Sequence, residues 1–506
     1  MIATIMNTRL VRFFPLLLLA VACSAADLTG NWAITPPNAE GAKKLYFKLK
    51  QEGSNVTGTI RTEHVYYFVK ESSPGPEDTT NLIASMIDNG NERFIQYQVK
   101  RVGDDLHIIY PRRRPNAPVR ATVAKRVPDS EGAYPARLPI PAKLRQVPYN
   151  GLAKTPPMGW NSWNKFGAAI DDATIRAMAD LMASNGMKEA GYQYINIDDG
   201  WASVRDAKGE IVPNKKFPDM KALADYVHSK GLKLGIYSSP GPDTCAGYEG
   251  SYGHEEQDAA TFAKWGVDAL KYDWCGAINI YTSDEMQAVY QKMGEALLAT
   301  KRPILYSLCQ YGRAEVWKWG PEVGGNLWRT TGDITDTWES MKGIGDRQNS
   351  LAQFAAPGHW NDPDMLEIGN GGMTDTEYRT HMSWWAMLAA PLLAGNDLRK
   401  MTPETLAILT NRDIIAIDQD KAGKQGARIL RTGNLEVWLR ELDGGERAIA
   451  IFNFGPEQGS VNVKWADLRI AKPVKGRDLW LQKDLTFGDA LTATVPSHGT
   501  VMWRVK

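Results

Sequence analysis

The sequence predicts a multidomain protein with a central (β/α)8 (TIM) barrel, a small N-terminal β-domain and a C-terminal antiparallel β-domain. The chain has 506 residues, more than one hydrophobic core usually serves, so two or three domains are expected. Strand patterns alternate with helical patterns over residues 154–420, as in a (β/α)8 barrel. On both sides, over residues 27–128 and 424–506, apolar and polar residues alternate as in antiparallel strands.

The composition is that of a globular protein, with 43% hydrophobic and 23% charged residues. Lysine and arginine number 59 and aspartate and glutamate 58, so the formal net charge is +1. This balance gives no electrostatic reason to expect binding to nucleic acid or to an anionic membrane surface. Nothing in it points to an oligomeric state.

Residues 1–25 have the pattern of a signal peptide. Arg9 and Arg12 precede an apolar stretch over residues 13–22, which is too short to span a bilayer and is followed by small residues. Alternatively, Cys23 could be the lipid-bearing first residue of a lipoprotein. We therefore expect an exported protein, periplasmic or extracellular, that has no membrane span but could carry a lipid anchor.

The two flanking β-domains are predicted from short alternating strands. We expect the N-terminal one to be a small β-sandwich or open barrel. Prolines recur between residues 128 and 157, so residues 129–153 are expected to form a stiff linker that leaves the N-terminal domain separable. The strand patterns cover residues 28–34, 44–50, 56–60, 94–99 and 106–110 in the first domain and 435–439, 448–452 and 501–505 in the last.

The central region contains eight strand patterns separated by helical ones. A helix capped by Asp171 or Asp172 follows the first strand, and further helices are expected over residues 219–230 and 255–265 and from Met286. A doubly wound open sheet is the alternative, but it usually has fewer strands and would need a phosphate loop after the first. The predicted strands span residues 158–163, 194–201, 234–239, 269–275, 304–311, 327–333, 359–365 and 391–397.

No motif for a metal or an organic cofactor is present. The seven histidines form no His-Glu-x-x-His, there is no Cys-x-x-Cys, and no glycine-rich phosphate loop occurs. After export, three cysteines (Cys245, Cys275 and Cys309) would lie in an oxidising compartment, where a pair is plausible but three cannot all pair.

Polar residues collect at the carboxyl ends of the predicted strands, where barrels of this kind place their chemistry. Burying so many like charges together is costly unless they bind something. A helix cap or surface ion pair explains any single aspartate equally well, but it explains the whole set poorly. The set consists of Trp160, Asp198, Asp199, Tyr237, Lys271, Asp273, Gln310, Arg329, Asp333, Asp362 and Asp364.

Two of these carboxylates suggest a reaction. Lys271 and Asp273 are two residues apart on a strand and can point to the same side, although a simple ion pair explains this spacing as well. Asp333 follows Gly332, which permits a ligand to approach closely. Two carboxylates from different strands, one kept ionised by a cation, are what glycoside cleavage requires. The Asp362-Pro-Asp364 segment is interpreted as a turn with a helix cap.

Four motifs resemble those of glycoside hydrolase family 27, which contains α-galactosidases and α-N-acetylgalactosaminidases. They are Pro-Met-Gly-Trp-Asn-Ser-Trp at 157–163, Ile-Asp-Asp-Gly-Trp at 197–201, Lys-Tyr-Asp-Trp-Cys at 271–275 and Gly-His-Trp-Asn-Asp-Pro-Asp-Met at 358–365. They occur in the family's order. The resemblance covers about residues 150–506 and leaves out the N-terminal β-domain.

The resemblance implies a retaining mechanism with Asp273 as the nucleophile and Asp333 as the general acid/base. It also implies a disulfide between Cys245 and Cys275 beside the nucleophile. One position departs from the family, because Gln310 stands where many α-galactosidases have glutamate, which affects selection at the sugar 2-position. The implied sugar contacts are Asp198 and Asp199 with the 4- and 6-hydroxyls, Lys271 with the 3- and 4-hydroxyls, Arg329 on the 2-hydroxyl side, Trp160 and Tyr237 in the wall, and Gln310 and Asp364.

The expected activity is therefore that of an exo-acting retaining α-galactosidase that needs no metal or cofactor. Other specificities of the same family are alternatives: β-L-arabinopyranosidase, α-N-acetylgalactosaminidase or isomalto-dextranase. From another class, the chain could be a non-catalytic glycan-binding protein whose N-terminal β-domain is the lectin. The presence of both Asp273 and Asp333 argues against a catalytically dead barrel.

Overall fold

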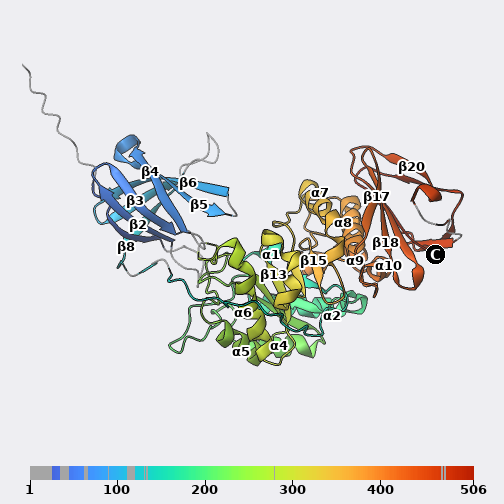
Figure 1. Ribbon diagram of the computed structural model, residues 1–506, viewed down its shortest axis with the longest axis horizontal. Helices are drawn as coiled ribbons and strands as arrows, with labels where there is room; N and C mark the ends of the chain where they lie inside the picture. The colour runs from blue at the N-terminus through green and yellow to red at the C-terminus, as the bar shows by residue number, and fades with distance from the viewer. Residues whose placement is uncertain are drawn as a thin grey trace, which may run out of the picture.

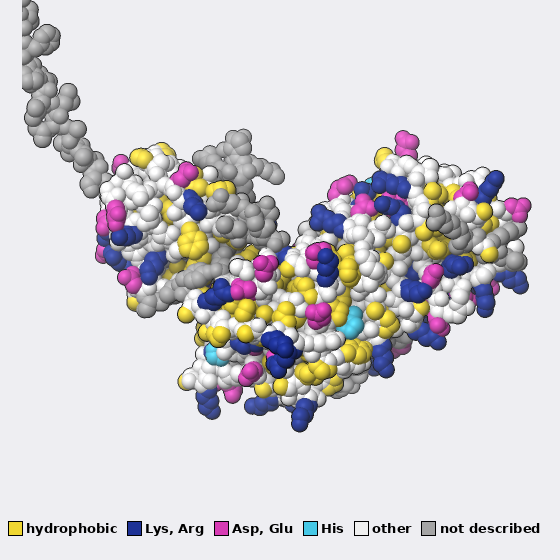
Figure 2. All heavy atoms as spheres, in the orientation of Figure 1, with side chains coloured by type: hydrophobic (Ala, Val, Ile, Leu, Met, Phe, Trp, Pro, Cys, Tyr) yellow, Lys and Arg dark blue, Asp and Glu magenta, His cyan; other side chains and the backbone are white. Residues whose placement is uncertain are grey.

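The structure is a computed structural model with three bodies in a row, coloured from blue to red along the chain in Figure 1. It describes residues 26–34, 45–61, 66–88, 91–110, 120–129, 131–132, 135–278, 280–468, 471 and 475–506. The expected signal peptide, with Cys23, lies outside these residues. Among the helices of the described part, none is long and apolar enough to cross a membrane. Acidic and basic side chains are interspersed over the face seen in Figure 2.

The N-terminal domain is a closed eight-stranded antiparallel barrel, which differs from the sandwich or open barrel that we expected. Consecutive strands pair in order, and β1 also pairs with β8, with Trp32 opposite Arg126. Along β2, Phe47 and Leu49 are buried inside while the alternate lysines are exposed. The strands are β1 (Gly30–Ile34), β2 (Leu45–Glu52), β3 (Asn55–Arg61), β4 (Tyr66–Pro74), β5 (Thr80–Asp88), β6 (Asn91–Val102), β7 (Asp105–Tyr110) and β8 (Arg120–Arg126).

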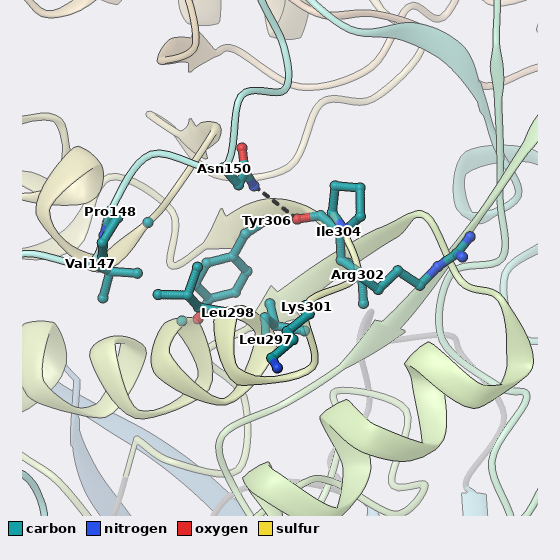
Figure 3. A pocket seen from close by; sticks show the side chains of 12 residues that line it. Val147, Pro148, Asn150, Leu297, Leu298, Lys301, Arg302, Ile304 and Tyr306 are labelled. Atoms are coloured by element: carbon teal, nitrogen blue, oxygen red, sulfur yellow. Dashed lines mark hydrogen bonds between the residues drawn. The ribbon is translucent and has the colours of Figure 1, made fainter.

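The proline-rich segment after this barrel is bound along the central barrel instead of spanning open solvent. The Val147 amide donates to the Glu322 carbonyl at 2.7 Å, and the side-chain amide of Asn150 donates to the Ile304 carbonyl at 3.0 Å. Figure 3 shows Val147, Pro148 and Asn150 lining one pocket together with Leu298 and Ile304. The expected linker is therefore a strap that fixes the position of the chain entering the central barrel.

The central domain is the expected (β/α)8 barrel, with eight parallel strands in sequence order around the ring. β16 pairs with β9, and a bridge between Leu366 and Ala394 joins the β15 side to β16. This closure excludes the doubly wound open sheet. The strands end earlier than their sequence patterns, so many of the polar residues lie on the loops that follow. The strands are β9 (Met158–Asn161), β10 (Tyr194–Asn196), β11 (Lys233–Ser238), β12 (Ala269–Asp273), β13 (Leu305–Cys309), β14 (Leu327–Arg329), β15 (Trp360–Asp362) and β16 (Leu392–Ala394).

Helices cover the outside of this barrel, and their ends follow the expected caps. Asp171 caps α2 by accepting from the Thr174 amide at 2.8 Å, and Asp219 caps α4 in the same way. After β13 the crossover contains two 3-10 turns, η3 and η4, in place of an α-helix. The helices are α1 (Trp163–Phe166), α2 (Asp172–Ser184), α3 (Met187–Ala190), α4 (Met220–Ser229), α5 (Glu255–Trp265), α6 (Met286–Ala299), α7 (Trp338–Arg347), α8 (Asp375–Leu388), α9 (Pro403–Leu409) and α10 (Arg412–Asp418). The 3-10 turns are η1 (Pro76–Asp78), η2 (Ser283–Glu285), η3 (Arg313–Lys318), η4 (Gly320–Val323), η5 (Gln348–Ser350), η6 (Ala352–Phe354), η7 (Leu398–Lys400), η8 (Asp443–Gly445) and η9 (Trp465–Leu468).

The C-terminal domain is antiparallel, as expected. A six-stranded sheet in the order β17-β18-β19-β24-β21-β22 accompanies a two-stranded sheet, β20-β23. The larger sheet packs against α8, where the Trp384 ring lies 5.7 Å from that of Trp438 and 5.6 Å from that of Phe452. This domain therefore shares a hydrophobic core with the barrel. Its strands are β17 (Ala427–Thr432), β18 (Leu435–Glu441), β19 (Arg447–Asn453), β20 (Gly459–Lys464), β21 (Lys475–Asp478), β22 (Lys483–Thr486), β23 (Ala490–Val495) and β24 (Thr500–Val505).

Candidate active site

The carboxyl ends of the barrel strands bring the predicted aspartates to one mouth. Five of them are buried, and Asp333 is the exception, with 62% of its side chain exposed. The buried ones are Asp198, Asp199, Asp273, Asp362 and Asp364. Each buried carboxylate needs partners, and those partners show how the mouth is organised.

Asp273 is the last residue of β12. The Tyr237 hydroxyl, on β11, donates to its Oδ2 at 3.1 Å, whereas its buried Oδ1 has no hydrogen-bond partner among the residues that the structure describes. Burial raises the pKa of Asp273, and the positive charge of Lys271 opposes this rise. One oxygen is thus held in place and the other is left to meet a ligand, which suits a nucleophile.

Arg329, at the end of β14, connects Asp333 to the buried part of the site. Its Nη2 donates to Asp333 Oδ1 at 3.1 Å and pairs with Asp364 Oδ2 at 2.9 Å. Burial opposes the charge of Arg329, but the surrounding acidic groups outweigh it and raise its pKa. Asp333 is therefore held by a fixed cation and remains in contact with solvent. It can exchange protons with water, as a general acid/base must.

Asp198 and Asp199 follow β10, two strands from β12 in the ring. Asp198 Oδ2 accepts from Asn161 Nδ2 at 2.8 Å and from Lys271 Nζ at 2.9 Å. Asp199 Oδ2 accepts from the Ala246 amide at 2.7 Å. Burial raises the pKa of Asp199 to about 7, whereas for Lys271 the effect of burial is outweighed by Asp198 and other acidic groups, so its pKa is raised. Further donors, such as sugar hydroxyls, would stabilise the ionised form of Asp199.

The disulfide between Cys245 and Cys275 is confirmed, and Cys309 is a free, buried thiol. The Tyr311 hydroxyl lies 3.4 Å from Cys245 Sγ and 3.8 Å from Cys275 Sγ. The two sulfurs also lie near an oxygen of Asp273, but a bridged pair offers no thiolates to a metal ion. The bridge ties the loop after β11 to the residues after the candidate nucleophile.

Gln310 follows β13 and is completely buried. Neither its Oε1 nor its Nε2 has a hydrogen-bond partner within the described part of the chain. A buried amide without partners costs free energy, so Gln310 suits a ligand that offers it both a hydrogen-bond donor and an acceptor. A sugar hydroxyl fits both a donor and an acceptor.

Trp160 was expected to line the sugar pocket, but the structure places it in the core. Its neighbour Asn161 points into the barrel, and alternation along β9 sends Trp160 to the opposite face. There the ring is fully buried beside Phe166, and its Nε1 donates to the Asn396 carbonyl at 2.7 Å. Trp163, which the sequence reasoning missed, is only partly buried and begins α1 directly beyond the mouth end of β9.

Asp364 supports the site from within the protein. Its Oδ1 accepts from the Met365 amide at 2.8 Å, and its Oδ2 accepts from the Ile334 amide at 2.9 Å as well as pairing with Arg329. It adopts φ of 89°, a strained conformation for a non-glycine residue. Its carboxylate therefore braces Arg329 and the loop after Asp333. The expected turn is present, because Asp362 Oδ1 accepts from the Asp364 amide at 2.8 Å, but the expected helix cap was wrong, since the next helix, α8, is capped by Thr374.

The sequence reasoning also passed over Tyr311 and Asn161. Tyr311 lies beside the disulfide, and Asn161 holds Asp198 through its side-chain amide. Asn161 directly follows Trp160 within the first motif, so alternation along the strand was the signal that could have found it.

Comparisons with known proteins match two parts of the chain. Residues 155–420 match the family model described as alpha galactosidase A, and residues 432–505 match the one described as alpha galactosidase C-terminal beta sandwich domain. An α-galactosidase of Cyamopsis tetragonoloba is 48% identical over 367 residues, which cover 71% of this chain and 88% of that protein.

Solved structures extend these matches. That of α-galactosidase I from Mortierella vinacea has 37% identity and a TM-score of 0.68, covering 70% of this chain and 98% of that one. A structure from Bacteroides fragilis has 32% identity and a TM-score of 0.69, and it covers 96% of this chain and 99% of its own. This coverage reaches into the N-terminal barrel.

Proposed function

The chain belongs to the α-galactosidase family of glycoside hydrolases, and we propose that it is an exo-acting retaining enzyme that removes terminal α-D-galactosyl residues from oligo- or polysaccharides. The observation that carries the mechanism is the contrast between two carboxylates at one mouth. Asp273 is buried, and one of its oxygens has no hydrogen-bond partner among the described residues, whereas Asp333 is exposed beside Arg329.

The reaction proceeds by double displacement. Asp273 attacks the anomeric carbon while Asp333 donates its proton to the departing glycosidic oxygen. Asp333 then takes a proton from water, which attacks the same carbon and breaks its bond to Asp273. Tyr237 and Lys271 hold and stabilise the carboxylate that leaves. Two inversions leave the product in the α configuration.

The wall of the pocket supports a galactose-type sugar. The axial 4-hydroxyl of galactose is directed to Asp198 and Lys271, and the 6-hydroxyl to Asp199. An α-glucoside has an equatorial 4-hydroxyl that points away from this pair. A β-L-arabinopyranoside has the same ring stereochemistry but lacks the hydroxymethyl group, so it leaves Asp199 without that hydrogen bond. A site built around a lost bond can discriminate by about 10⁴-fold.

A panel of nitrophenyl glycosides tests this proposal. We expect a higher kcat/KM for the α-D-galactoside than for the β-L-arabinopyranoside, and almost none for the α-glucoside. A higher value for the arabinoside, or for an α-N-acetylgalactosaminide, would assign another specificity of the family. Binding of galactose without any hydrolysis would indicate a glycan-binding protein.

Variants test the two roles. Asp273→Asn should abolish turnover, and Asp333→Ala should lose most activity on poor leaving groups but much less on activated aryl glycosides. Asp225→Asn on the outer helix α4 is the matched control, since its side chain is 57% exposed. Proton NMR of the first product should show the α anomer, and a β anomer would exclude the retaining mechanism.

We also propose that the protein is exported, to the periplasm or beyond. Arg9, Arg12 and the apolar stretch over residues 13–22 support this, and so does a disulfide, which persists in oxidising compartments. Mass spectrometry of the mature N-terminus should find cleavage near Ala25 or a lipid on Cys23. An intact Met1 on the cellular protein would contradict export.

A further inference from the structure

Arg61 of the N-terminal barrel contacts the loop that follows β11 at the active-site mouth. Arg61 ends β3, and its Nη2 pairs with Asp243 Oδ2 of the central barrel. The Arg61 side chain is 10% exposed and that of Asp243 is 1% exposed. The guanidinium lies over the rings of Tyr46 and Tyr66, at 5.7 and 5.4 Å from their centroids. The ion pair is thus enclosed, and removing one partner of a buried ion pair strongly destabilises the fold because the other charge is left uncompensated.

Asp243 belongs to the loop after β11 that carries two site contacts. The Ala246 amide, three residues later, is the donor to Asp199, and Cys245 lies between them in the bridge to Cys275. The Asp243 carbonyl also accepts from the Gly276 amide at 3.1 Å. One side chain of the N-terminal barrel therefore anchors the segment that holds Asp199.

This loop lies directly on the chain that follows the nucleophile. A Cβ added to Gly276 would lie 2.4 Å from the Asp243 carbonyl oxygen, and one added to Gly241 would lie 2.1 Å from the Gly276 carbonyl carbon. The two segments are in close backbone contact, so a displacement of Asp243 would displace its neighbours as well.

We propose that Arg61 is a positioning residue for the hydrolysis, and that the N-terminal barrel is a structural part of the active-site wall. Arg61 fixes Asp243, the loop then presents the Ala246 amide to Asp199, and Asp199 is held where the 6-hydroxyl of the sugar binds. The binding of the 6-hydroxyl by Asp199 rests on the proposed function, whereas the ordering of the loop by Arg61 does not. In Figure 1 the blue barrel lies next to the central barrel.

The test compares Arg61→Ala with Arg61→Lys in the full chain, with Arg126→Ala as the control. Arg126 belongs to the same barrel, where it lies over the Trp32 ring. Kinetics with the galactoside and with the arabinopyranoside separate positioning from general destabilisation. We expect Arg61→Ala to lower the galactoside-to-arabinoside ratio of kcat/KM about tenfold, mainly through the KM for the galactoside. Arg61→Lys should restore part of the ratio because it keeps the charge.

Hydrogen exchange of the peptide over residues 243–250 gives a readout that needs no substrate. This peptide should exchange faster in Arg61→Ala than in the wild type or Arg126→Ala. Equal loss on both substrates with unchanged exchange would mean a merely structural role and would overturn the inference. If the wild type hydrolyses no galactoside, the proposed function fails, and the exchange result still decides whether Arg61 orders the loop.

Discussion

At the scale of single residues, the site is a set of carboxylates that the fold buries at a cost. Burial raises the pKa of Asp199 to about 7, that of Asp362 to about 6 and that of Glu367, beside the mouth, to about 7. A carboxylate held this way favours hydrogen-bond donors when it is ionised. Burial of these carboxylates therefore costs folding free energy, and hydrogen bonds from sugar hydroxyls would offset part of that cost.

The burial of Asp199 predicts how stability depends on pH. The pKa of an aspartate is 3.8 in the unfolded chain, and that of Asp199 is about 7 in the folded protein. Between these pH values the folded protein therefore binds more protons than the unfolded chain. Stability therefore falls as pH rises through this window, by up to about 1.4 kcal/mol per pH unit for this group. Asp199→Asn removes this loss, so urea unfolding from pH 4 to 8 should show the variant gaining on the wild type. Parallel curves for the two proteins would show that Asp199 is not the group responsible.

The two tryptophans of the first motif should respond differently to truncation. Trp160 is a core residue, so Trp160→Ala should lower the free energy of unfolding by about 3–5 kcal/mol. Trp163 lies at the mouth, so Trp163→Ala should raise the KM for an aryl galactoside about tenfold, with little loss of stability. Thermal unfolding and steady-state kinetics on both variants check this. A raised KM for Trp160→Ala together with a loss of stability for Trp163→Ala would indicate that Trp160 lines the sugar pocket after all.

At the scale of elements, the loop after β11 is fixed to three different parts of the molecule. It is held by the disulfide to Cys275, by the Ala246–Asp199 bond and by the ion pair of Asp243 with Arg61. Loops that follow barrel strands carry the chemistry of such folds, and they work only when their geometry is fixed.

Removing the disulfide should therefore affect stability and catalysis together. The bridge closes a loop with a sequence separation of 30, for which chain entropy gives about 3–4 kcal/mol. Cys245→Ser with Cys275→Ser should lower the unfolding free energy by about this amount and also reduce kcat/KM. Thiol counting on the unreduced, unfolded mature protein should find Cys309 alone. Cys309→Ser is a control for the loss of a thiol without loss of the bridge.

At the scale of the whole molecule, the N-terminal barrel and the strap act as parts of the central domain. The strap continues upstream of Gln146, where the Leu138 amide donates to Tyr252 at 2.8 Å and the Arg145 amide donates to Gln291 at 2.9 Å. The N-terminal barrel is therefore connected to the central barrel by a segment that is itself bound to the central barrel, and not by a free linker.

Two truncations separate these contributions. A chain that begins at Pro135 keeps the strap but lacks Arg61, so its galactoside kcat/KM should fall about as far as in Arg61→Ala, about tenfold. A chain that begins at Gln146 also loses the upstream strap contacts and should have a lower Tm than the first. Differential scanning calorimetry and kinetics on both chains check this. Wild-type activity in both would show that the N-terminal region is dispensable for the site.

Features that depend on local pattern could be predicted from the amino-acid sequence. The (β/α)8 class followed from the alternating strand and helix periods, and the caps Asp171 and Asp219 followed from local chemistry. Motifs placed the aspartates at strand ends, and the family resemblance implied the Cys245–Cys275 bridge. These properties depend on residues that are close in the chain or on a pattern shared with relatives, so the sequence is enough to predict them.

Features that depend on contacts between distant residues could not be predicted from the sequence. The N-terminal barrel closes because β1 meets β8, and no local signal encodes that contact. Trp160 turns to the core because its neighbour Asn161 faces Asp198, and Gln310 is buried without a hydrogen-bond partner within the described part of the chain. Arg61 and Asp243 lie 182 residues apart, and each alone looks like an ordinary surface charge. A contact of that kind has no periodicity and exists only once both barrels have folded.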